Sequence, residues 1–222
     1  MQSNITRRSA LVGVASVAGM QLLPNVAHAQ RIPSNGEMVF KVLRDGKSHI
    51  GEHRLKFVNK GKRLLITNAL DIDVKVAGFS AFSYKGAVQE LWQGQRLIAL
   101  NSKLRENGKS FAVEARAIGN RLQIKGEDGI YDAPGDTLPT SYWNMGVVQK
   151  RALLDPQRGK ILRVSSKPVA RNNLKIPNQR VAATRFDMNG DVKTSIWYSD
   201  AYEWVGMRFV AKGSSISYIR DA

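Results

Sequence analysis

Apolar and polar residues alternate along most of this chain, and this period of two constrains its fold more than any other feature. Residues 63–76 show the pattern well, with Leu70 and Ile72 on one side of the alternation and Asp71 and Asp73 on the other. Successive side chains of a β-strand point to opposite faces, so the pattern predicts a strand with one dry and one solvated face. Strands of this kind are typical of antiparallel sheets.

Turns with a central glycine separate the alternating segments. Asp45-Gly46 lies between the predicted strands 38–43 and 48–58, and Asn107-Gly108 and Asn189-Gly190 recur further on. Glycine accepts the positive φ that tight hairpin turns require. We therefore predict an all-β fold: a single antiparallel β domain of about a dozen strands, arranged as a curved sheet, barrel or sandwich.

The alternation lapses between residues 126 and 160. Glu127-Asp128-Gly129 and Ala133-Pro134-Gly135 have the composition of loops, and the one helix that the sequence allows lies around residues 144–154. Here we predict irregular structure with little helix.

The first 29 residues have the pattern of a cleavable export signal. Arg7-Arg8 precede an apolar stretch, Pro24 ends it, and Ala27-His28-Ala29 offers small residues for a signal peptidase. The stretch is too short for a spanning helix, so we expect no transmembrane anchor after cleavage. We predict cleavage after Ala29, a β domain over residues 30–222 and a periplasmic protein, with Sec and twin-arginine export both open.

The chain is strongly basic and has no cysteine. Its net charge is +16, with 34 Lys and Arg against 18 Asp and Glu. An exported protein does not normally meet nucleic acid, so anionic lipid or another envelope polyanion is the partner we expect, and solvated charge that only aids solubility is the alternative. The absence of cysteine excludes thiol catalysis and lipid attachment at a cysteine.

His49 and His53 are the two histidines after the predicted signal. On one strand they would share a face about 13 Å apart, which is too far for two ligands of one metal. We therefore predict no metal or cofactor. His53 stays a candidate general base, with Asp45 or Glu52 as its partner. Ser141 lacks the glycine-flanked elbow of a nucleophile, and we expect it to cap a turn.

The aromatic residues suggest a binding site. We expect Trp92 and Trp197 to fill the core. Tyr142 and Trp143 lie in the irregular region, where they could line the mouth of a cavity between sheet and loop. Basic residues of the neighbouring strands could form a cationic rim for an anionic head group: Lys85, Arg96, Lys103 and Arg105.

Several blocks of sequence together resemble a known family. They are Glu90-Leu-Trp92, Leu138-Pro-Thr-Ser-Tyr-Trp-Asn144, Leu154-Asp155 and Ile196-Trp-Tyr198. They are similar to an uncharacterised group of exported proteobacterial proteins, domain of unknown function family 6134, over nearly the whole mature chain. The resemblance implies export and a mostly antiparallel β fold, and it implies no activity. Ser199 departs from the family pattern, in which an acid usually follows Trp-Tyr, and residues 84–87 lack a histidine common there.

Three functions fit these observations. The sequence favours a non-catalytic binding or carrier module for an apolar or amphipathic anionic ligand, because export, basicity and a β fold occur together without a catalytic motif. A structural or interaction protein of the envelope is the alternative. A hydrolase that uses His53 and a carboxylate is the third, so whether the protein is an enzyme stays open.

Overall fold

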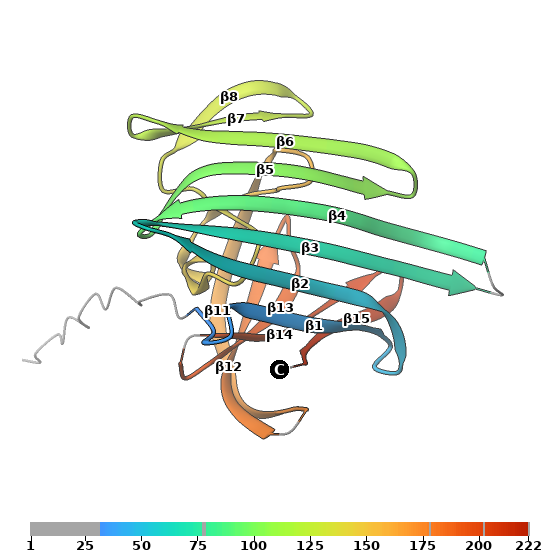
Figure 1. Cartoon of the computed structure of the whole chain (residues 1–222). Coiled ribbons are helices and arrows are strands. Elements are labelled where there is room, and N and C mark those ends of the chain that lie inside the picture. The colour runs from blue at the N-terminus through green and yellow to red at the C-terminus, as the bar shows by residue number, and fades with distance from the viewer. Residues whose placement is uncertain (1–31, 77–78, 178, 202, 222) are drawn as a thin grey trace, which may run out of the picture.

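A computed structural model describes residues 32–76, 79–177, 179–201 and 203–221, so the predicted signal and its cleavage site lie outside the described residues. These residues form one 15-stranded sheet in the order β8-β7-β6-β5-β4-β3-β2-β1-β15-β14-β13-β12-β11-β10-β9. Every strand pair is antiparallel except β9 and β10. The all-β prediction is confirmed. The sheet curls so that β11–β14 pass behind β1–β6 (Figure 1).

The first half of the sheet is a continuous meander. Its strands are β1 (Glu37–Arg44), β2 (Ser48–Lys60), β3 (Arg63–Val76), β4 (Phe79–Gln93), β5 (Arg96–Glu106), β6 (Lys109–Ile118), β7 (Arg121–Gly126) and β8 (Gly129–Pro134). The second half consists of β9 (Leu138–Pro139), β10 (Ala152–Leu154), β11 (Ile161–Ile176), β12 (Gln179–Gly190), β13 (Thr194–Ser199), β14 (Trp204–Ala211) and β15 (Ser214–Arg220). β15 pairs with β1 and so joins the halves.

The predicted hairpin turns at Asp45-Gly46 and Asn107-Gly108 form as expected, whereas Asn189 and Gly190 are still paired with β11 at the end of β12. Asp45 and Gly46 have φ values of 52° and 70°, and Asn107 and Gly108 have 48° and 86°. Two successive positive φ values match the right-handed twist of the flanking strands.

Two glycines inside strands let the sheet bend around its inner face. Gly51 of β2 has φ 150° and Gly86 of β4 has φ 140°. A Cβ atom at Gly86 would lie 2.2 Å from the Lys103 carbonyl oxygen of β5, and one at Gly51 would lie 2.0 Å from the Asp71 carbonyl oxygen of β3. Only glycine permits this close approach of neighbouring backbones.

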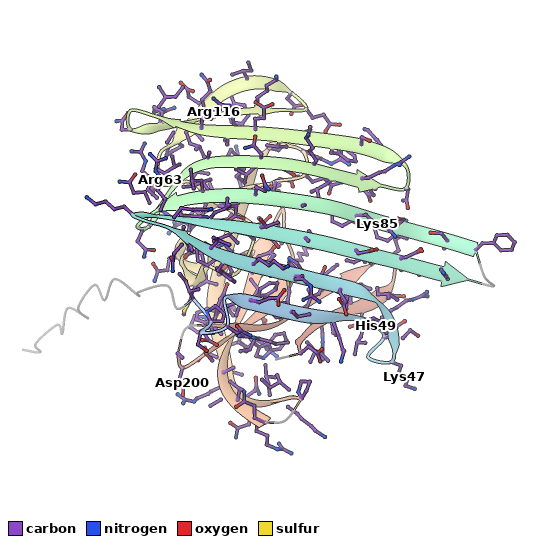
Figure 2. The ribbon with its side chains drawn as sticks, in the orientation of Figure 1. Lys47, His49, Arg63, Lys85, Arg116 and Asp200 are labelled. Carbon is purple, nitrogen blue, oxygen red and sulfur yellow. The ribbon has the colours of Figure 1, made fainter. Side chains whose placement is uncertain are left out.

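The prediction that His49 and His53 share a face is wrong. Val42 pairs with Gly51 and Leu43 with His49, so a bulge at Ile50 interrupts the alternation between them. His49 is exposed near the β1–β2 turn (Figure 2), whereas His53 is buried.

Residues 126–160 contain more strand than the sequence indicates. The predicted loop at 129–134 is β8, and the segment around 144–154 forms only a 3-10 turn, Met145–Gln149, followed by β10. Glycine and proline marked these residues as loop, but β8 is an edge strand, where proline needs no ladder partner.

The core lies on the inner face of the curled sheet. Its largest fully buried side chains include Phe40, Trp92, Tyr198 and Trp204. Trp204 packs on Phe40 with ring centroids 4.0 Å apart, which brings β14 against β1. No helix of the described residues is long and apolar enough to cross a membrane.

Candidate functional site

A cavity of about 490 Å³ opens on the inner face of the sheet. Strands from both halves and the segment before the 3-10 turn contribute to its wall. Apolar side chains make up much of the lining: Leu70, Val88, Leu104, Leu162, Met207 and Phe209. Its polar and aromatic lining includes His53, Asn68, Tyr84, Ser141, Tyr142 and Tyr218. An apolar wall with a few convergent polar groups is typical of small-molecule sites.

A buried carboxylate lies beneath this polar group. Glu90 of β4 has no exposed surface, and its Oε2 accepts hydrogen bonds from Trp92 Nε1 at 2.9 Å and Trp143 Nε1 at 3.0 Å. Burial raises the pKa of Glu90, while the hydrogen bonds from Trp143 and Trp92 oppose that rise. Glu90 is not part of the cavity lining. It therefore lies behind the lining, where it accepts hydrogen bonds from two indole rings.

Asn68 of β3 is the hydrogen-bond partner of His53. Its carbonyl oxygen Oδ1 faces His53 Nε2, and an amide oxygen only accepts. His53 Nε2 bonds that carbonyl oxygen and must carry the proton. His53 Nδ1 is left as an acceptor, and it has no hydrogen-bond partner among the described residues.

His53 is neutral at physiological pH. Burial lowers its pKa from 6.5 to about 4, although the hydrogen bond to Asn68 opposes the shift. The ring packs edge-on against Trp204 at 5.4 Å and Tyr218 at 5.6 Å. The expected partners of His53 were Asp45 or Glu52, but its bonded partner is the amide of Asn68.

A left-handed backbone places Ser141 and Trp143 in the interior. Tyr142 between them has φ 57°, an uncommon conformation for an aromatic residue, and its carbonyl accepts a 2.7 Å hydrogen bond from the Tyr198 hydroxyl. Ser141 lines the cavity, is only 4% exposed, and its Oγ has no partner among the described residues. Ser141 does not cap the turn as predicted; Asn144 does, because its side chain accepts from Gly146 N at 2.9 Å.

The predicted aromatic pair is divided between two roles. Tyr142 lines the cavity, while Trp143 is buried beside it against Trp92 and Phe57, with ring centroids 5.2 and 5.7 Å apart. Trp92 fills the core as expected. Trp197 does not: it is half-buried and lines a separate hollow of about 300 Å³.

The four predicted rim cations lie outside the cavity lining. Lys85 forms an ion pair with Asp71 at 3.0 Å on β3, and Arg105 lies opposite Lys85 on β5. Figure 2 shows Lys85 on β4. Lys103 and Arg105 are exposed, because Leu104 between them takes the inward position.

Arg96 donates a hydrogen bond to the Gly119 carbonyl at an exposed turn. The charged residues that do line the cavity are Asp155, Asp191 and Lys193, so its lining is not cationic.

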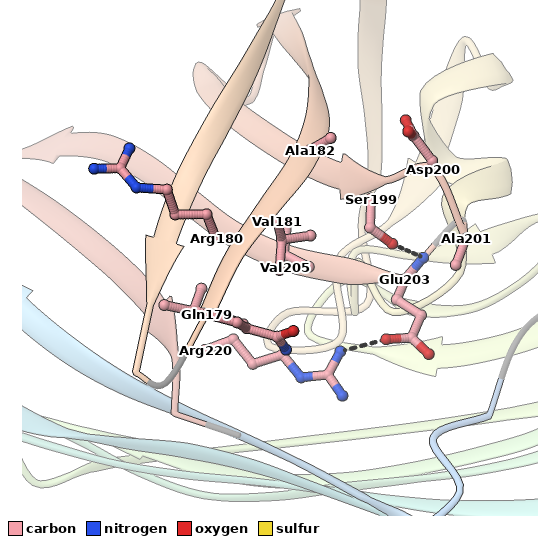
Figure 3. A pocket seen from close by; sticks show the side chains of 11 residues that line it. Gln179, Arg180, Val181, Ala182, Ser199, Asp200, Ala201, Glu203, Val205 and Arg220 are labelled. Carbon is pink, nitrogen blue, oxygen red and sulfur yellow. Dashed lines mark hydrogen bonds and ion pairs between the residues drawn. The ribbon is translucent and has the colours of Figure 1, made fainter.

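A second hollow of about 470 Å³ lies between the β11–β12 turn and the β13–β14 turn (Figure 3). Arg180 and Asp200 are at its sides, and Arg220 reaches it from β15. Arg220 is already paired with Glu203 at 3.0 Å, which neutralises the innermost charge of the hollow. In the described ranges no group of three or more His, Asp or Glu could hold a metal ion.

A family model described as "Domain of unknown function (DUF6134)" matches residues 40–221. The chain belongs to this family. The resemblance seen in the sequence is confirmed, and the match covers every cavity residue named above. No curated protein matches the chain.

The fold of this chain is similar to a solved structure, the crystal structure of a beta-barrel-like protein of domain of unknown function DUF1849 from Brucella abortus. The TM-score is 0.57 at 9% sequence identity, over 83% of this chain and 94% of that one. This likeness concerns the fold alone.

Sequence reasoning missed Asn68 and Glu90, although a signal was present. Asn68 stands between Ile66 and Leu70 on the apolar side of β3, and Glu90 stands between Val88 and Trp92 on β4. A polar residue at an inward position of an alternating strand needs a buried partner, and it marks a polar network inside the core.

Proposed function

We propose that this DUF6134 protein is a non-catalytic binding or carrier module of the periplasm, and that its inner cavity holds an apolar or amphipathic ligand. The observation that carries the proposal is the cavity of about 490 Å³. It has an apolar wall, and its lining includes His53 and Ser141, which have buried polar atoms without partners among the described residues. Ligand cavities commonly occupy about 300–1,000 Å³ and combine these features.

The wall supports an elongated apolar ligand better than a small polar one. Leu70, Val88 and Leu104 come from three neighbouring strands, and Met207 and Phe209 from β14. Removing apolar ligand surface from water contributes about 25 cal/mol per Å², so such a wall supplies affinity without charge.

The hydrolase alternative is less well supported by the site. With a pKa of about 4, His53 is a weak base at neutral pH. Its hydrogen-bond partner is the amide of Asn68, which cannot stabilise an imidazolium as a carboxylate does. These groups suit a binding site that holds a fixed acceptor.

The test is native mass spectrometry of protein purified from the periplasm and exposed to an envelope lipid extract. We expect a reproducible bound species with the mass of an amphipathic molecule. A protein that carries nothing, and that binds no apolar dye such as Nile red, would exclude the carrier function.

The basic β11–β12 hairpin supports the alternative that the protein is an interaction protein of the envelope. Between Asp155 and Asp187 the chain has no acidic residue, and the β11–β12 hairpin exposes Arg163, Lys167 and Lys175. Among the described residues none of these three has an ion pair, so the hairpin could contact an envelope polyanion. Sedimentation with anionic phosphatidylglycerol vesicles, compared with neutral vesicles, tests this contact.

Export is tested by sequencing the N-terminus of the protein from a periplasmic fraction. The proposal expects the mature chain to begin at Gln30, after cleavage behind Ala29. Full-length protein confined to the cytoplasm would contradict it.

A further inference from the structure

We infer that the cavity binds a neutral amphipath whose polar end donates a hydrogen bond, such as the hydroxyl of a long-chain alcohol, and that His53 Nδ1 and Ser141 Oγ receive that end. The inference rests on the proposed binding function and names its ligand class. It replaces the anionic head group expected from the sequence.

The hydrogen bond between His53 and Asn68 has one possible direction. The Asn68 carbonyl oxygen accepts from His53 Nε2. This leaves a single neutral tautomer for the imidazole, with a lone pair on Nδ1. The Asn68 carbonyl thus determines which hydrogen-bonding group His53 offers to the cavity.

Two buried polar atoms of the cavity lining have no partner within the described ranges. His53 is 5% exposed and Ser141 is 4% exposed, and both line the cavity. Neither His53 Nδ1 nor Ser141 Oγ has a hydrogen-bond partner in the described part of the chain. Buried polar atoms are normally satisfied, so two unsatisfied atoms in one cavity indicate a ligand that completes them.

The charges of the lining do not favour an anion. An anionic head group would bring a second acceptor against the lone pair of Nδ1. Asp155 and Asp191 of the lining also repel an anion, and Lys193 is the one Lys or Arg of the described lining. A hydroxyl can donate to Nδ1 and accept from the Ser141 hydroxyl, so it satisfies both atoms without a buried charge.

The experiment compares three probes of equal chain length: 1-decanol, decyl methyl ether and decanoate. Binding is followed by tryptophan fluorescence, since Trp204 lies 5.4 Å from the His53 ring and 6.0 Å from the Tyr142 ring. We expect decanol to bind about tenfold more tightly than the ether, as a hydrogen bond to an otherwise unsatisfied buried acceptor predicts. His53→Phe should lower the decanol affinity to that of the ether, while the control His49→Gln should leave it unchanged.

The outcomes separate the two proposals. Equal affinity for decanol and the ether, or tightest binding of decanoate, overturns the ligand class but leaves the binding function standing. Failure of all three probes and of Nile red overturns both.

A second measurement needs no variant. The ¹⁵N resonances of His53 should show a protonated Nε2 and an unprotonated Nδ1, and decanol but not the ether should shift Nδ1. A protonated Nδ1 in the free protein contradicts the inference.

Discussion

The inner cavity and the β11–β12 hairpin differ in almost every physical respect. The cavity has an apolar wall and buried polar atoms without partners in the described structure, and its described lining contains two acidic residues and one basic residue, Asp155, Asp191 and Lys193. The hairpin is exposed and basic, with no acidic residue before Asp187. The excess positive charge of this hairpin lies away from the candidate ligand cavity, so charge and ligand recognition should respond to different mutations.

The largest expected effect is on the packing beneath the cavity. Trp143→Ala removes a buried ring and one of the two indole donors of Glu90. We expect it to lower the free energy of unfolding by about 3–5 kcal/mol. Trp197→Ala is the matched control, because Trp197 is half-buried outside the cavity, and about 1 kcal/mol is expected there. Chemical denaturation measures both, and equal losses would mean that the two regions are not packed differently.

The next largest effect is a pH dependence from His53. Its folded-state pKa of about 4 lies below the unfolded value of 6.5, so the unfolded chain binds the proton first. The contribution is fully present above pH 6.5 and is lost as the pH falls toward 4, by about 3 kcal/mol in total.

Glu90 acts in the opposite direction because burial raises its pKa, so the comparison must be between variants. Urea titrations between pH 7 and 4 should show a shallower fall for His53→Gln than for the wild type. His49→Gln should follow the wild type, because His49 is exposed. Parallel curves for all three proteins would show that His53 is not the titrating group.

A smaller effect is expected at Ser141. Its Oγ has no partner in the described structure, so Ser141→Ala should change the free energy of unfolding by less than about 1 kcal/mol. The same variant should lower the affinity for decanol about three- to tenfold. A large loss of stability would mean that Oγ is bonded in the free protein and is not waiting for a ligand.

The smallest effect on stability is expected in the hairpin. Replacing Arg163, Lys167 and Lys175 together with Gln should change the free energy of unfolding by no more than about 0.5 kcal/mol per site, because the three side chains are exposed. Ligand affinity in the cavity should not change, whereas any salt-sensitive binding to anionic vesicles should weaken. Reduced decanol binding in this variant would break the proposed separation of charge and cavity.

The fold was predictable because alternation and turns are local. Residues 63–76 were bounded correctly, and Asp45-Gly46 forms the expected turn. The bulge at Ile50 could not be predicted, because it depends on how β2 pairs with β1. Because of this bulge, His49 and His53 do not lie on the same face of β2.

The site was harder to predict than the fold. Tyr142 lines the cavity as expected, but the rim cations could not be placed without the register between strands. Asn68 and Glu90 occupy inward strand positions, where apolar residues are expected. These two polar residues indicate a buried polar network, which the overall charge of the chain does not reveal.

The central claim is that the inner cavity is the ligand site, and a bulky substitution that fills the cavity tests it most directly. The same substitution on the outer face of β3 is the control. Leu70 lines the cavity, and Leu65 of the same strand lies on the outer face, opposite Val58 and Leu91. Nile red and decanol titrations of Leu70→Trp and Leu65→Trp should show loss of binding in the first variant and wild-type binding in the second. Wild-type binding by a folded Leu70→Trp protein would contradict the claim that this cavity is the ligand site.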